Sequence, residues 1–86
     1  MIKDNVPLIS AIIDALLFLE SAASNEVDPD SAVRCMENIA SSILRLDKSD
    51  QLALRLNFEK IAEASQDANY ANFVRKLPDS IGLATP

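Results

Sequence analysis

The stretch PDSAVRCMENIASSILRL, residues 29–46, decides the fold class of this chain. At about 100° per residue, its apolar side chains fall on one half of a helix and its polar side chains on the other. Asp28 is placed to cap this helix, and Pro29 suits its first turn. We therefore predict an amphipathic helix with one packed face, on which Cys35 behaves as a small buried hydrophobic residue. That face consists of Ala32, Val33, Cys35, Met36, Ile39, Ala40, Ile43, Leu44 and Leu46.

Similar patterns predict three further helices, over residues 7–23, 50–64 and 68–77. Ser49 is the expected cap of the second, and Pro78 is expected to stop the third, because a residue before proline is pushed out of the helical region. The short link 47–49 predicts an antiparallel hairpin between 29–46 and 50–64. The predicted fold is therefore all-α: a small antiparallel four-helix bundle, a single domain over 1–86 with a short C-terminal tail, 78–86.

The composition agrees with helices packed on helices. The chain has 86 residues, 49% of them hydrophobic but only 5% aromatic, with a single Gly. A lone Cys cannot form an internal disulfide, which favours a reducing compartment. The apolar run from Val6 to Leu19 is short for a membrane span and carries Asp14. We therefore expect a cytoplasmic protein without a membrane segment.

The net charge of −5 is concentrated in the first third of the chain. Residues 1–31 carry one Lys against six acidic residues, whereas residues 32–86 carry seven basic and seven acidic residues. An acidic surface repels the phosphates of nucleic acid, so nucleic-acid binding is disfavoured. A protein is the more plausible partner.

The residues needed for common catalytic centres are missing from the sequence. There is no His, one Cys and one Gly, which excludes His general bases, Ser/His/Asp triads, typical zinc sites and Gly-rich phosphate loops. Glu59 and Glu63 are spaced as a carboxylate pair, but they fall on a face shared with Lys60 and predicted to be solvated. We predict no enzymatic activity, no metal, no cofactor and no small-molecule substrate.

The helix predicted over 7–23 is apolar on nearly all sides, and few elements are available to surround it. This indicates either self-association or a bound protein, unless the tail folds back over the helix. Leu52 and Leu56 make the first half of the helix predicted over 50–64 apolar on a second side, and Ile81 and Leu83 are apolar pegs in the tail. The candidate interface is Leu8, Ile13, Leu17, Leu52, Leu56, Ile81 and Leu83.

Two segments, DPDSAV at 28–33 and LPDSIGL at 77–83, resemble a pattern in small bacterial helical proteins to which no activity is assigned. Size, acidity and helical class are also similar to nuclease-toxin immunity proteins, although their Tyr-Tyr motif is not present. Asp30-Ser31 resembles the start of the second helix of acyl carriers, but Ala32 and Arg34 follow instead of aliphatic and acidic residues.

Three functional hypotheses follow from the sequence. The first is an interaction module, either a homodimer or the acidic, immunity- or antitoxin-like regulatory partner of another protein. The second is an acyl-carrier-like protein that uses Ser31. The third is a structural accessory domain without a discrete site.

Overall fold

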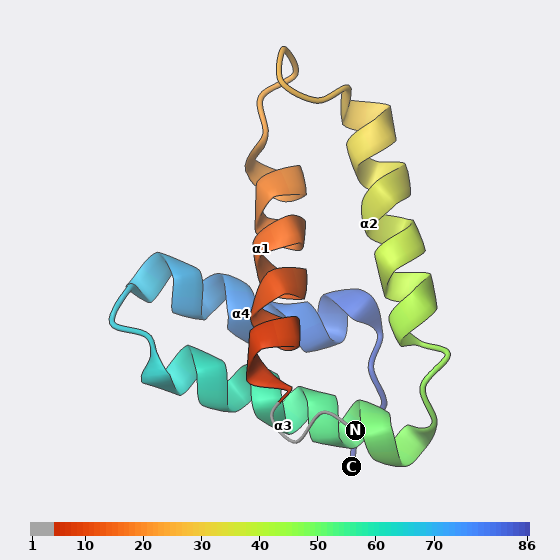
Figure 1. Cartoon of the computed structure of the whole chain (residues 1–86), viewed down its shortest axis with the longest axis vertical. Coiled ribbons are helices and arrows are strands. Elements are labelled where there is room, and N and C mark those ends of the chain that lie inside the picture. Colours follow the sequence, from red (N-terminus) through yellow and green to blue (C-terminus); the bar gives the residue numbers. More distant parts are fainter. Residues whose placement is uncertain (1–4) are drawn as a thin grey trace. The chain divides into compact units, whose positions relative to one another are not determined.

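The computed structural model describes residues 5–86, which form four α-helices and no strand (Figure 1). The helices are α1 (Val6–Ser21), α2 (Pro29–Ile43), α3 (Lys48–Ala64) and α4 (Ala68–Ile81). The predicted all-α class with four helices is thus confirmed. The chain divides into two compact units, residues 1–39 and 40–86, with the boundary inside α2. The single domain over 1–86 stays a prediction, and each unit is described by itself below.

Local capping sets the helix ends in the first unit. Asn5 occupies the N-cap position of α1 without a side-chain hydrogen bond, and Pro7 lies in the first turn. The helix ends at Ser21, two residues before the predicted end, because Ala22 has an extended backbone with ψ of 135°. Asp28 caps α2 as predicted, since its Oδ2 accepts hydrogen bonds from both the amide and the hydroxyl of Ser31 at 3.0 Å.

The apolar face predicted for residues 29–46 is only partly covered, which corrects the expectation that it is packed. Ala32 and Ile43 are buried, but Val33 is 49% exposed and Cys35 is also exposed. Leu44 and Leu46, 40% and 41% exposed, lie beyond the end of α2. Within the first unit, α1 and α2 run in opposite directions without close backbone packing (Figure 1). An amphipathic pattern shows that a face is suited to burial, but it does not supply the element that covers it.

The junction between α2 and α3 also differs from the prediction. α2 ends at Ile43 and is followed by two turns closed by hydrogen bonds between residues three apart. The amide of Arg45 donates to the carbonyl of Ser42 at 3.2 Å, and the amide of Leu46 donates to the carbonyl of Ile43 at 3.0 Å. Asp47, rather than Ser49, caps α3, because its Oδ1 accepts the Asp50 amide at 2.8 Å. Asp and Ser are comparable caps, so residue type alone did not decide between the two positions.

The second unit is organised around α3 and α4, which run antiparallel and pack closely (Figure 1). This pair forms a helical hairpin, and the hairpin expected between 29–46 and 50–64 spans the two units and stays a prediction. Ser65 ends α3 and Asp67 caps α4, which confirms the predicted break between the helices. Phe58 and Val74 are fully buried, at 0% exposure. The other buried residues of this unit are Ile43, Leu54, Ala62, Ala71, Leu77, Pro78, Ile81 and Leu83.

Pro78 does not stop α4, contrary to the prediction, and the helix continues to Ile81. A proline inside a helix removes one backbone donor, but its ring here is buried, so the apolar burial offsets part of that loss. The helix ends at Gly82, which has a left-handed backbone with φ of 90°. The amides of Gly82 and Leu83 both donate to the carbonyl of Pro78, at 3.1 and 2.9 Å. This arrangement resembles a Schellman motif and turns the chain back toward α3.

We expect Gly82→Ala to lower the free energy of unfolding by about 1 kcal/mol, because a side chain disfavours the left-handed conformation. A Cβ at this position would lie 4.0 Å from Cδ1 of Leu44, an ordinary contact, so the cost is conformational rather than steric. Urea unfolding measures the effect. Gly82→Asn is the matched variant and should cost less, since Asn tolerates this conformation better. Equal stability of the Ala variant and the wild type would contradict the assignment.

Candidate functional site

The exposed apolar face of α1 consists of Leu8, Ala11, Ala15 and Phe18. All four side chains are exposed. The two large ones, Leu8 and Phe18, are 51% and 55% exposed. Their spacing of three, four and three residues places them along one side of the helix. The opposite side of α1 is buried, with Ile9, Ile13 and Leu16 at 4%, 0% and 5% exposure. Exposure of large apolar side chains along one helix face is typical of an interaction surface.

This face contains no charged residue, although the helix belongs to the acidic third of the chain. Half-buried Ile12 and Leu19 border it on one side, and exposed Asp14 borders it on the other. Asp14 therefore lies at one edge of a strip that is itself uncharged. Such a strip can be covered by an apolar surface without the cost of burying an unpaired charge.

The predicted interface residues separate into three groups. Leu8 and Leu56 are exposed, at 51% and 57%, and remain available to a partner. Leu17 and Leu52 are half-buried. The remaining three are buried at 0–7% exposure and are not available in this conformation: Ile13, Ile81 and Leu83. Phe18, Ala11 and Ala15 were not singled out from the sequence, although their regular spacing with Leu8 carried the signal.

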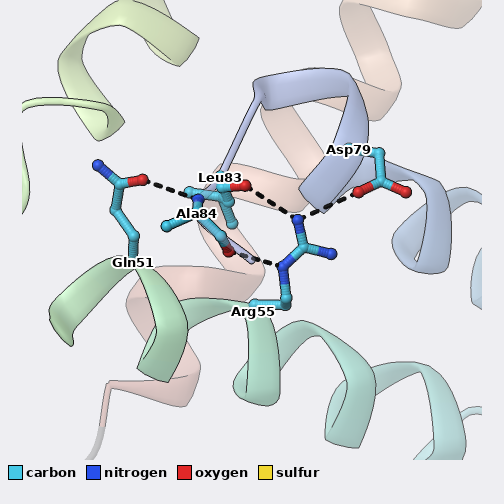
Figure 2. Close-up of polar contacts among 5 residues, drawn as sticks. All are labelled: Gln51, Arg55, Asp79, Leu83 and Ala84. Carbon is cyan, nitrogen blue, oxygen red and sulfur yellow. Dashed lines mark hydrogen bonds and ion pairs between the residues drawn. The ribbon is translucent and has the colours of Figure 1, made fainter. Parts of the chain in front are cut away.

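The C-terminal tail is held within its own chain, which answers the question that the sequence left open. Figure 2 shows Arg55 of α3 reaching the tail: its Nε donates to the carbonyl of Ala84 and its Nη2 to that of Leu83, both at 3.0 Å. Nη2 also pairs with Oδ1 of Asp79 at 3.1 Å. The Arg55 side chain is only 22% exposed, whereas Asp79 is 82% exposed. The ion pair is thus open to solvent, and the bonds to the two carbonyls contribute more to holding the tail.

Gln51 lies one turn before Arg55 on α3 and also contacts the tail. Its Oε1 accepts the amide of Ala84 at 2.9 Å (Figure 2). Its Nε2 donates to the carbonyls of Leu44 and Leu46, at 3.2 and 2.9 Å. One side chain therefore ties both the link before α3 and the tail after α4 to the same helix. Sequence reasoning missed Gln51 and Arg55 because their partners are up to 33 residues away.

A groove of about 310 Å³ lies in the second unit. It is lined by Arg55, Glu59, Glu63, Arg75 and Pro78. Glu59 and Glu63 are exposed, in agreement with the solvated face that the sequence predicted. The groove is open to solvent and its two cations and two acids balance in charge, so it selects neither an anionic nor a cationic ligand.

The hydroxyl of Ser31 donates to the capping carboxylate of Asp28 and so takes part in the start of α2. Within residues 5–86 no cluster of three or more His, Cys, Asp or Glu side chains could hold a metal ion. In the same part of the chain, each helix is too short or too polar to cross a membrane.

The chain was compared with known proteins. No protein-family model, no curated protein and no solved structure matches it.

Proposed function

We propose that this protein is a non-catalytic interaction module that binds another polypeptide through the exposed apolar face of α1. The observation that supports this proposal is the exposure of Leu8 and Phe18, each more than half accessible, on a face without any charge. Large apolar side chains gathered on one helix face mark a contact with protein more often than isolated exposed residues do. The bound polypeptide is either a second copy of the chain or a different protein.

The remaining chemistry of the chain favours the same class of function. The sequence has no His, and among residues 5–86 the acids and bases are exposed or, in the case of Arg55, take part in the contacts that hold the tail. The acidic first third disfavours nucleic acid and favours protein surfaces that are apolar at the centre and neutral or basic at the rim. The proposal therefore includes the absence of enzymatic activity.

The test compares the full chain with the double variant Leu8→Ser/Phe18→Ser. The chain is expressed with a tag in cells, its complexes are fixed by chemical cross-linking and resolved by mass, and the purified protein is followed by sedimentation over a range of concentrations. We expect the wild type to form complexes, with itself or with another protein, and the double variant to lose them. Loss of two large exposed anchors is expected to weaken binding by about tenfold or more.

Leu46→Ser is the matched control for this experiment. Leu46 is a leucine outside the candidate interface that is 41% exposed, so the control removes the same kind of side chain from another part of the chain. We expect it to leave every complex intact. Identical behaviour of the wild type and the double variant, with both monomeric at all concentrations and alone after cross-linking, would contradict the proposed function.

A further inference from the structure

We propose that α3 carries a binding site for a polypeptide segment, and that a segment of another protein with a leucine followed by a small residue can replace the tail there. In the structure, Leu83 and Ala84 of the chain's own tail occupy this site. All of its residues belong to the second unit, 40–86. The inference therefore concerns a different surface from the exposed apolar face of α1 and goes beyond the proposed function.

The site binds the main chain of its occupant. Arg55 donates to the carbonyls of Leu83 and Ala84, both at 3.0 Å, and Gln51 accepts the amide of Ala84 at 2.9 Å (Figure 2). Every residue has the carbonyl, and every residue except proline has the amide. A segment of another protein that follows the same path can therefore form the same three bonds. In the recognition of extended peptides, such main-chain bonds supply affinity, and pockets for side chains supply specificity.

The burial of the tail indicates which side chains the segment needs. Leu83 is 4% exposed, so the first position takes a side chain of the size of leucine. Ala84 is half-buried, so the second position favours a small residue. Thr85 and Pro86 are exposed, and the positions after the second are therefore not selected.

Both side chains that bind the tail are also held by contacts that do not involve it. Gln51 donates through Nε2 to the carbonyls of Leu44 and Leu46, which leaves Oε1 for the tail. Nη2 of Arg55 pairs with Oδ1 of Asp79 at 3.1 Å. These contacts limit the rotation of both side chains while one occupant replaces another. Preorganised groups of this kind reduce the entropy lost on binding.

The end of α4 does not depend on the docked part of the tail. The amide of Gly82, a residue with φ of 90°, closes the last turn on the carbonyl of Pro78. This bond uses neither the side chain of Leu83 nor the main chain of Ala84. The tail can therefore leave the site while α4 keeps its C-terminal cap.

A separate segment can also reach a groove that the tail does not enter. The groove of about 310 Å³ is lined by Arg55 and extends along α3 to Glu59 and Glu63. The residues before Leu83 and Gly82 belong to α4, so they are not free to lie in this groove. The residues before the leucine of a separate segment are not restricted in this way.

Competition with the attached tail determines the expected affinity. One buried leucine and three hydrogen bonds make a small contact, for which we expect a dissociation constant of about 0.1–1 mM when the tail is weakened. A tail on a short connection has an effective concentration in the millimolar range. The wild type should therefore bind the same segment about tenfold more weakly.

The test is an NMR titration with the peptide DSIGLATP, which has the sequence of residues 79–86. The isotope-labelled protein is the full chain, either as the wild type or as Leu83→Ala, whose tail keeps its length but loses its buried side chain. We expect Leu83→Ala to bind the peptide about tenfold more tightly than the wild type does, with shifts in the side-chain signals of Gln51 and Arg55. A peptide with serine in place of its leucine should not bind.

Matched variants locate the bound peptide. Arg55→Ala, added to Leu83→Ala, should abolish binding, whereas Leu8→Ser/Phe18→Ser in the same background should leave it unchanged. Thr85→Ala alone should bind as weakly as the wild type, because Thr85 is exposed. If Leu83→Ala shows no cooperative unfolding transition, Ala84→Pro takes its place, since it removes the amide that Gln51 accepts and keeps the leucine.

The inference is overturned if a folded Leu83→Ala or Ala84→Pro chain does not bind the peptide. Equal affinities of the wild type and the tail variant also overturn it, because the tail then does not compete for the site. Binding that persists without Arg55, or that is lost in Leu8→Ser/Phe18→Ser, places the peptide elsewhere and has the same result. The proposed function is decided by the complexes of the Leu8→Ser/Phe18→Ser chain, so the two proposals can fail separately.

Discussion

Replacement of Phe58 by alanine is expected to lower the free energy of unfolding by about 3–5 kcal/mol. Phe58 is fully buried, at 0% exposure, in the middle of α3. Its removal takes away apolar burial and leaves a cavity that neighbouring side chains fill only in part. For a chain of 86 residues the total stability is about 4–13 kcal/mol, so this single change removes a large fraction of it.

Urea unfolding followed by circular dichroism measures this effect. Leu56→Ala, two residues earlier on the same helix, is the matched control because Leu56 is 57% exposed. We expect the control to change stability by no more than about 0.5 kcal/mol. Similar losses at the two positions would show that α3 presents a different face to the core.

Leu83→Ala is expected to cost about 2–4 kcal/mol, although Leu83 lies outside every helix. Its side chain is 4% exposed, and its carbonyl accepts a hydrogen bond from Arg55. Loss of the side chain should therefore both reduce apolar burial and loosen the tail. We expect the amide of Ala84, which donates to Gln51, to exchange with solvent faster in this variant.

Thr85→Ala is the control for Leu83→Ala, since Thr85 is exposed two residues further along the tail. It should leave the unfolding transition and the exchange of the Ala84 amide unchanged. If Leu83→Ala behaves like Thr85→Ala in both measurements, the tail does not contribute to the core of the second unit.

The helices could be predicted from the sequence because their signals are local. The apolar spacing around Phe58 and Val74 and the break near Asp67 depend on residues within a few turns of one another. The helix ends were harder to predict where two sequence signals for the end of a helix competed. Pro78 was predicted to stop α4, but the sequence does not show that its ring is buried or that Gly82 supplies the actual end.

The arrangement of the helices and most of the candidate site depended on contacts that a sequence does not specify. The face of residues 29–46 was correctly recognised as apolar, but its exposure could not be known without the positions of the other helices. The same applies to Arg55, whose hydrogen-bond partners lie in the tail, far along the chain. For α1, the sequence identified the excess of apolar residues, and the structure identified which of them, Leu8 and Phe18, are exposed.

The two-sided contact of Gln51 has a consequence for local motion. Its amide oxygen and nitrogen are engaged at the same time, by Ala84 on one side and by Leu44 and Leu46 on the other. Rotation of this one side chain would break all three bonds together. We therefore expect opening of the segment that enters α3 to loosen the segment that follows α4, and the reverse, even though the two are far apart along the chain.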